Sequence, residues 1–348
     1  MQHPLGRFLA RRWALLFLAL ELAVFSVAGR GFLSLNGIQI VLFYGTSLLL
    51  LATAETFVIV TGGIDLSVGY LMGFATIVSA KLCAALFRAG LSPALSILLA
   101  MVGTRGIGLV PGLLSGLLVG RLKVPAFLAT FSTGGIVYGI SALLIGGVAA
   151  KEVPLLANAI GNSYLLYWAP GRGLSLFSRP EVARGVHVLE FVPSMVVLTA
   201  VFVGIGAYLL KRTRFGRHAY AIGGNLDAAT RAGINPGRHL AAVYMISALF
   251  ASLSGVIYML EYVTGKADAG VSFLLDAIVA VVIGGASLYG GIGTVGGTVL
   301  GALILAVLET GLRMAGVQTF DKFIAVGLIL ILAVLIDRFF PELIHKED

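Results

Sequence analysis

Residues 214–236 read RFGRHAYAIGGNLDAATRAGINP, a polar, basic and glycine-punctuated stretch between two long apolar segments. Because glycine adopts backbone conformations that other residues avoid, the stretch predicts a short amphipathic helix held between glycine hinges. A plain connection between two apolar helices needs only a few polar residues. The extra length and pattern therefore indicate a docking surface for a soluble partner.

The composition is that of a membrane protein. Hydrophobic residues make up 59% of the 348 residues and charged residues 11%, and the mean hydropathy is +1.02. Soluble domains carry about 25% charged residues, so most of this surface must face lipid. The 46 glycines are consistent with this, since small residues let helices approach closely in a membrane. We predict an all-α polytopic membrane protein in which residues 1–348 form a single transmembrane domain.

About ten stretches are long and apolar enough to cross a bilayer, which takes about 20 residues. They are 13–29, 37–60, 65–87, 93–119, 125–147, 191–210, 239–262, 274–288, 294–313 and 320–338. The basic residues gather at the ends of these spans. The positive-inside rule explains this clustering, and with it the net charge of +8, without a nucleic-acid partner.

The same rule gives the orientation. It places the N-terminus, the loop 211–237 and the C-terminus in the cytoplasm. The mixed-charge loop 148–190 then lies outside, either as a solvated connector or as a lip that meets an external partner.

Two glycine pairs mark a weak internal repeat. Residues 59–67 (IVTGGIDLS) are answered by residues 282–289 (VIGGASLY). Transporters built from inverted repeats place their substrate near the midplane, at helices that are broken by glycine. We therefore predict two inverted repeats, about 36–147 and 239–338, each with a broken helix. Close packing at a helix crossing is the plainer explanation of the same glycines.

Four acids lie within or beside the predicted spans: Glu55, Asp65, Asp276 and Glu309. Ionisable groups in such places usually face a bundle interior or a water-filled path. Asp65 and Asp276 can each cap a half-helix, because aspartate accepts hydrogen bonds from the free N–H groups at a helix start. Asp65 can alternatively contact a substrate. Glu309 and Arg313 are four residues apart and can form an ion pair along one helix.

Glu55 has no evident capping role. It either pairs with a cation such as Lys81 or Arg88 or contacts a polar substrate. The chain has one cysteine, Cys83, no cluster of residues with metal-ligand spacing, and no phosphate-binding Gly-x-x-x-x-Gly-Lys loop. We therefore expect that this chain binds no cofactor and cannot hydrolyse ATP itself.

Five motifs occur in order between about residues 36 and 338: TGGIDLSVG (61–69), VPAFLAT (124–130), FGRHAYAIGGN (215–225), LDAIVAVVIGG (275–285) and GGIGT (290–294). Together they resemble the permease subunits of ribose-type ATP-binding-cassette sugar importers, which are related to the galactose, xylose and arabinose permeases. The pair Ala54-Glu55 departs from the small residues usual in that family. This departure leaves the identity of the sugar open.

The resemblance implies one half of a type II-like importer in a bacterial inner membrane. Two permeases form the pore as a homodimer or a heterodimer, and a periplasmic or lipid-anchored binding protein delivers a monosaccharide or related polyol. A cytoplasmic ATPase docks on the loop 211–237 and uses ATP and magnesium.

We predict two functional sites. In the coupling helix, Gly223, Gly224 and Gly233 allow tight turns, while Asn225, Asp227 and Arg231 meet the ATPase. The substrate pathway is lined by six hydroxyl and carboxylate side chains that can hydrogen-bond a sugar weakly enough to release it: Glu55, Thr61, Asp65, Ser67, Asp276 and Ser287.

Two other functions remain open. One is an ATP-driven permease for nucleosides or branched-chain amino acids. The other is an ion-coupled secondary transporter, which suits the buried acids but leaves the stretch 211–236 unexplained. The residues of the motifs around Asp65 and Asp276 favour a sugar permease over these alternatives.

Overall fold

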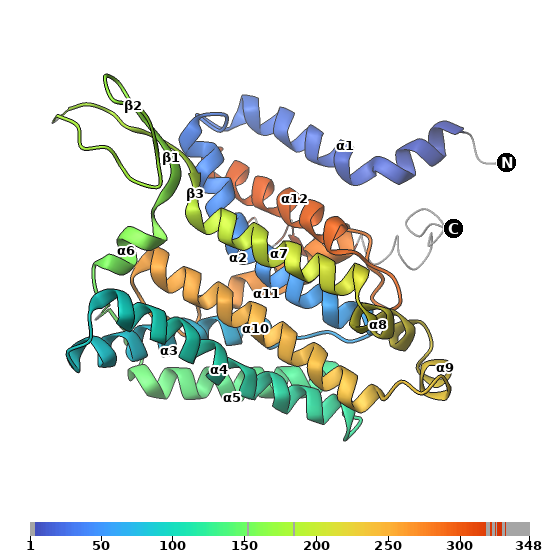
Figure 1. Ribbon diagram of the computed structural model, residues 1–348. Coiled ribbons are helices and arrows are strands. Elements are labelled where there is room, and N and C mark those ends of the chain that lie inside the picture. Colours follow the sequence, from blue (N-terminus) through green and yellow to red (C-terminus); the bar gives the residue numbers. More distant parts are fainter. Residues whose placement is uncertain are drawn as a thin grey trace.

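The computed structural model describes residues 4–151, 153–183 and 185–317 and the positions 321, 324, 326–328 and 331, with the backbone alone for residues 4–13. The helices of the bundle are α1 (Pro4–Ala28), α2 (Leu35–Val60), α3 (Val68–Arg88), α4 (Pro93–Gly120), α5 (Ala126–Ile145), α7 (Ser194–Arg212), α10 (Pro236–Tyr262), α11 (Val271–Ile283) and α12 (Val295–Met314). They run roughly side by side (Figure 1).

Seven of the described helices are long and apolar enough to cross a membrane: α2, α3, α4, α5, α7, α10 and α12. Residues 14–28 of α1 and the whole of α11 are shorter apolar helices. The prediction of a polytopic membrane protein is confirmed, although the chain is mostly rather than wholly helical. Most predicted ends agree within a few residues. The predicted span 320–338 lies almost entirely outside the described residues.

The helix α10 lies at the centre of the bundle and packs against α2, α3 and α4. Glycine recurs at every fourth position along the face of α4 that meets α10: Gly108, Gly112, Gly116 and Gly120. A Cβ atom on Gly116 would lie 2.5 Å from the Cα of Ala241, so the two backbones are in contact there. Close packing of this kind replaces the hydrophobic effect, which cannot drive helices together in lipid.

The two predicted helix breaks have the same pattern of backbone hydrogen bonds. At each, one N–H donates to the carbonyl five residues back and the preceding N–H donates three residues back, which is the Schellman ending of a helix. The bonds are Gly63 N to Val58 O and Gly62 N to Ile59 O after α2, and Ala286 N to Val281 O and Gly285 N to Val282 O after α11. Gly62 and Gly285 have φ of +82° and +88°, a conformation that favours glycine. Both predicted glycine pairs therefore end a helix. Gly62 is equivalent to Gly285, however, so the register is shifted by one residue from the predicted match of Gly62 with Gly284. The inverted orientation of the halves stays a prediction.

The loop 148–190 contains secondary structure that the sequence did not predict. The short helix α6 (Leu156–Gly161) precedes the strands β1 (Tyr164–Ala169), β2 (Gly173–Leu176) and β3 (Leu189–Pro193). They form an antiparallel sheet in the order β2-β1-β3. The span predicted at 191–210 begins instead at Ser194, because residues 191–193 belong to β3.

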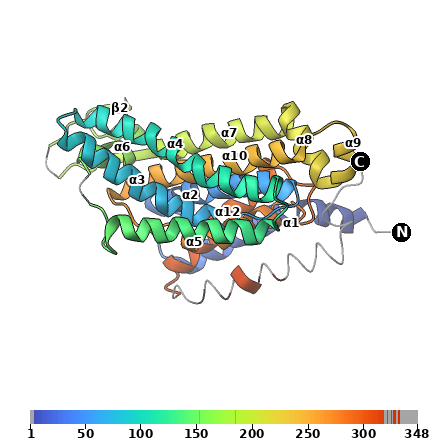
Figure 2. The ribbon, with the colours of Figure 1, turned by 90° about the horizontal axis from the view of Figure 1, so that it is seen from below.

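The stretch 214–236 folds at the opposite end of the bundle from the sheet (Figures 1 and 2). It forms two short helices, α8 (Arg214–Gly224) and α9 (Leu226–Arg231). Gly223 and Gly224 form the end of α8 rather than a hinge, whereas Gly233 has a φ of +85° and makes a turn.

Candidate functional site

Asp65 lies in the first helix break, and both oxygens of its carboxylate accept hydrogen bonds. Oδ1 accepts the N–H of Ser67 at 2.9 Å and also its hydroxyl, and Oδ2 accepts the hydroxyl of Ser247 at 2.7 Å. All three residues are buried. Because Ser67 is the N-cap residue of α3, Asp65 fixes the start of α3 and ties it to α10. This geometry resembles the predicted capping role, but the bonded N–H belongs to the cap residue rather than to the first helical turn.

Thr130 ties the same break to α5. Its hydroxyl accepts the N–H of Leu66 at 3.0 Å and lies 3.2 Å from the carbonyl of Ile64, to which it can donate. The break is therefore held by side chains from two other helices. Neither Thr130 nor Ser247 was among the predicted site residues, because nothing local in either span shows what it faces.

Glu55 lies fully buried on α2, beside Asp65. Its Oε2 accepts the N–H of Asp65 at 3.4 Å, and its Oε1 has no hydrogen-bond partner among the described residues. The hydroxyl of Tyr244 on α10 is likewise without a partner there, and it lies 2.7 Å from the position of a Cβ on Gly63. Buried polar atoms normally find partners, so these two mark the break as a polar site inside an apolar bundle.

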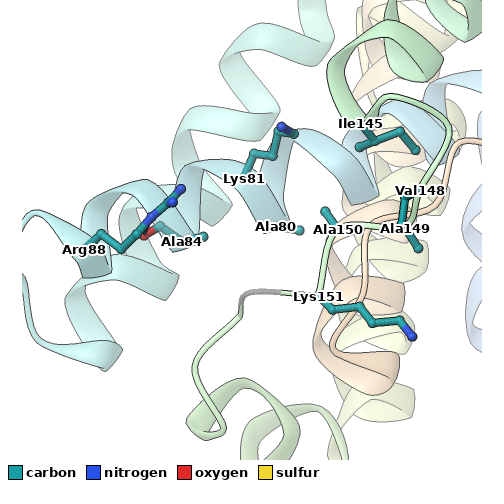
Figure 3. Close-up of a pocket in the computed structure, with 9 residues that line it drawn as sticks. All are labelled: Ala80, Lys81, Ala84, Arg88, Ile145, Val148, Ala149, Ala150 and Lys151. Atoms are coloured by element: carbon teal, nitrogen blue, oxygen red, sulfur yellow. Dashed lines mark hydrogen bonds between the residues drawn. The ribbon is translucent and has the colours of Figure 1, made fainter.

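The predicted pairing of Glu55 with Lys81 or Arg88 is wrong. Both cations line a cavity of about 380 Å³ near the far end of α3, next to residues 145–151 (Figure 3). The cavity lies near the bridge that pairs Ala150 with Gly265, at the end of the bundle that carries the sheet. In Figure 3 the ammonium groups of Lys81 and Lys151 point away from one another, so the cavity does not gather charge around one ligand.

Asp276 occupies a different place from the one predicted. It lies in the second turn of α11 and accepts a hydrogen bond of 2.6 Å from the hydroxyl of Tyr44 on α2. A capping role for Asp276 is therefore wrong. Glu309 and Arg313 form the predicted ion pair along α12, with 2.8 Å between Oε1 and Nη2.

Thr61 and Ser287 follow the ends of α2 and α11, one at each break. The hydroxyl of Thr61 donates to Val58 O at 2.8 Å, and that of Ser287 accepts the N–H of Tyr289 at 3.3 Å. Of the six predicted pathway residues, the structure thus gathers Glu55, Asp65 and Ser67 by direct hydrogen bonds and leaves the others at separate points.

Four glycines bring three distant segments into contact at the end of the bundle that carries α8. We call Gly62, Gly223, Gly290 and Gly291 the glycine junction. A Cβ on Gly223 would overlap the carbonyl oxygen of Val60 and lie 2.5 Å from Gly291 N, and a Cβ on Gly290 would lie 2.8 Å from Gly62 N. Gly291 N also donates to Val60 O at 2.8 Å. The end of α8 is thus packed backbone to backbone against both helix breaks.

Tyr220 strengthens this contact. Its hydroxyl donates to the carbonyl of Gly293, beyond the second break, at 2.6 Å. Burial raises the pKa of Tyr220, which keeps the phenol protonated as a donor. The helix α8 is therefore packed against both breaks through the glycine junction and bonded to the second one through Tyr220.

The short helix α9 is presented to solvent. Its N-cap Asn225 accepts the N–H of Ala228 at 2.9 Å, and Ala229 is the buried residue that holds the helix to the protein. Asp227 and Arg231 are exposed, and so is the apolar Leu226, at 49%. Asn225 thus caps α9, while Leu226, which was not among the predicted site residues, lies beside Asp227 and Arg231 on its surface.

The sequence profile of one protein family, described as the permease component of the branched-chain amino acid transport system, matches residues 37–336. The chain belongs to this permease family. Three relatives are the galactose/methyl galactoside import permease of Escherichia coli (33% identical, 88% of this chain and 87% of the relative), the ribose import permease of Escherichia coli (32%, 95% and 96%) and the fructose import permease of Rhizobium meliloti (33%, 93% and 84%). No solved structure matches the chain.

These relatives confirm the resemblance drawn from the five motifs. At the first helix break this permease has two buried polar atoms without a partner among the described residues, Glu55 Oε1 and the hydroxyl oxygen of Tyr244.

We predict that Glu55→Gln alters the ligand preference or the rate of uptake by this permease. Glutamine keeps the length of the side chain and an acceptor for the Asp65 N–H, so the fold should persist while the carboxyl group is replaced by an amide. Uptake by whole cells, compared across a panel of neutral sugars, polyols and amino sugars, measures the effect. If preference and uptake are both unchanged in a normally expressed variant, Glu55 does not contact the substrate.

Proposed function

We propose that this permease forms the translocation pathway for a monosaccharide or a related polyol in an ATP-binding-cassette importer. The observation that carries the proposal is the similarity over nearly the whole chain to permeases that import ribose, galactose and fructose. The chemistry of the first break supports it. Carboxylates and hydroxyls hydrogen-bond one another around Asp65, and the hydroxyls of a sugar can replace such partners one for one.

The energy for transport comes from a separate cytoplasmic ATPase that docks on α9. In this proposal Leu226, Asp227 and Arg231 meet the ATPase, and the glycine junction carries the motion of α8 to both helix breaks. ATP and magnesium belong to the ATPase, and this chain binds no cofactor. The permease lies in a bacterial inner membrane, with its N- and C-termini on the cytoplasmic side, as α9 is.

Two further partners complete the importer. A second permease, identical or related, forms the other wall of the pore, and a binding protein on the outer side delivers the sugar. High affinity then resides in the binding protein. Ser67 and Ser247 already donate hydrogen bonds to Asp65. A sugar must replace these donors, so the permease binds it weakly and releases it.

Two alternatives are less favoured. The description of the family names branched-chain amino acids, but the relatives reported above import sugars. An ion-coupled secondary transporter has no use for α9, whose exposed residues face away from the bundle.

We predict that Gly224→Arg and Leu226→Asp each abolish co-purification of the ATPase with the tagged permease. A Cβ on Gly224 meets no atom of the described residues within 4 Å, and Gly224 is exposed, so we expect arginine to disturb the docking surface and not the fold. Ala183→Arg, an exposed position in the loop at the other end of the bundle, is the matched control. Mild-detergent pull-downs from native membranes measure the loss, and size-exclusion profiles check folding.

If no ATPase accompanies the wild-type permease, and a pH gradient drives uptake by the purified protein in vesicles, the secondary-transporter function replaces this one. If the ATPase remains bound to both docking variants, the importer stands and α9 is not its dock.

A further inference from the structure

One face of the sheet β2-β1-β3 is mostly apolar: besides six apolar side chains it carries Tyr164, which pairs with Pro193. Residues directly opposite one another in antiparallel strands point to the same face. Leu166 pairs with Leu176 and Phe191, and Trp168 pairs with Leu174 and Leu189. These six side chains form what we call the apolar face: Leu166, Trp168, Leu174, Leu176, Leu189 and Phe191.

The apolar face is the uncovered side of the sheet. Leu174 is 68% exposed and Leu176 62%, and Trp168 and Leu189 are each about 40% exposed. On the other side Tyr167 and Ala169 are buried. The sheet therefore shields its mixed face and exposes its apolar one, the reverse of the usual arrangement of an antiparallel sheet in water.

The residue that follows β2 reinforces this arrangement. Phe177 is 74% exposed and has a φ of +60°, a conformation that costs free energy for a residue with a bulky side chain. Such strain persists where the surrounding structure or a function requires it. Here it adds an exposed aromatic ring to the end of the strand that carries Leu174 and Leu176.

The position of the sheet brings the apolar face to the membrane boundary. The strand β3 ends at Pro193 and the membrane span α7 begins at Ser194, without a connecting residue. Five residues of strand extend roughly 17 Å, so all of β3 lies close to the end of a span. Figure 1 shows the hairpin of β1 and β2 projecting away from the helices.

We propose that the apolar face rests in the interfacial layer of the bilayer and anchors this end of the permease to lipid. A soluble partner is a poorer match, because even specific protein interfaces are only about 57% apolar and carry many hydrogen bonds, whereas none of the six side chains is charged. The sheet also has the other residues of a membrane interface: Trp168 within the face and Arg172 in the turn between β1 and β2. Tryptophan and arginine are characteristic of that layer.

The test uses Trp168 as a reporter. The chain has one other tryptophan, Trp13, so Trp13→Phe leaves Trp168 as the sole emitter. In vesicles of phosphatidylcholine brominated near the top of the acyl chain, we expect the emission of Trp168 to be quenched relative to plain phosphatidylcholine. Leu174→Asn combined with Leu176→Asn should weaken the quenching, and an unchanged thermal midpoint of unfolding checks that the exposed pair does not affect the fold.

Trp168→Phe, which leaves Trp13 in α1, is the control for reconstitution. Quenching of Trp13 without quenching of Trp168 overturns the proposal. So does disulfide cross-linking between two copies at Leu174→Cys, in a Cys83→Ala background, because it assigns the face to a second permease. A blue shift of Trp168 that appears only when a binding protein is added overturns it as well. The experiment needs no sugar or ATPase, so its failure leaves the proposed import function untouched.

Discussion

Gly223→Ala is expected to destabilise the permease by about 1–3 kcal/mol, the usual cost of forcing an extra carbon into a packed interior, and to abolish most uptake. The added Cβ would overlap the carbonyl of Val60, and backbone on both sides leaves no flexible side chain to move aside. The substitution forces the end of α8 away from the glycine junction. Since Val60 O also accepts the N–H of Gly291, the separation loosens the contact between the two helix breaks.

The neighbouring glycine provides the matched control. A Cβ on Gly224 meets no atom of the described part of the chain within 4 Å, and alanine favours a helix over glycine by up to about 1 kcal/mol. Gly224→Ala should therefore keep or slightly raise the thermal midpoint and keep uptake. Thermal unfolding in detergent, ATPase co-purification and whole-cell uptake separate three effects: stability, docking and coupling. If Gly223→Ala and Gly224→Ala gave the same thermal midpoint and the same uptake, the glycine junction would not couple α8 to the helix breaks.

The spans and both breaks could be predicted from the sequence because their signals are local. Apolar length identifies a membrane helix, and a glycine that follows an apolar run identifies a Schellman ending. The same local signals identified the two glycine pairs but not their register, because Gly62 is equivalent to Gly285 rather than to Gly284. Such signals need no knowledge of which helices are neighbours.

The polar contacts between helices could not be predicted in this way. Tyr44 and Asp276 are 232 residues apart, and only the fold brings them together. Asp276 was expected to cap a helix because its span was predicted to begin at residue 274. The helix starts three residues earlier, at Val271, which moves the aspartate into the second turn. Glu21 and Glu261 are buried acids within predicted spans, and neither was singled out.

The sheet escaped prediction for a different reason. Its strands are four to six residues long, and their pairing joins segments that are up to about 30 residues apart. The exposed face is the apolar one, so the alternation that identifies a surface strand gives no indication of which side meets water. A charged, aromatic loop between two spans was the coarser interpretation available from composition.

Asp65→Ala is expected to have the largest effect at the first break. The substitution removes the acceptor of three buried donors at once, namely the N–H and hydroxyl of Ser67 and the hydroxyl of Ser247. Each buried donor left without a partner costs about 1–3 kcal/mol, so the total is comparable with the whole stability of a typical domain. We expect little folded protein in the membrane fraction. Asp65→Asn keeps one oxygen and should fold with an intermediate loss of stability.

Ser247→Ala separates the two roles of Asp65, because it removes the tie to α10 and leaves the two bonds to Ser67 intact. We expect a loss of about 1 kcal/mol in the free energy of unfolding. A double-mutant cycle with Asp65→Asn should give a coupling of about 0.5–3 kcal/mol, as for residues in one hydrogen-bond network. If Asp65→Asn instead unfolds like the wild type and loses only uptake, the carboxylate acts on the sugar and not on the break. We expect the loss to be largest for Asp65→Ala, smaller for Asp65→Asn and smallest for Ser247→Ala. This order follows from the number of hydrogen bonds to Asp65 that each variant removes.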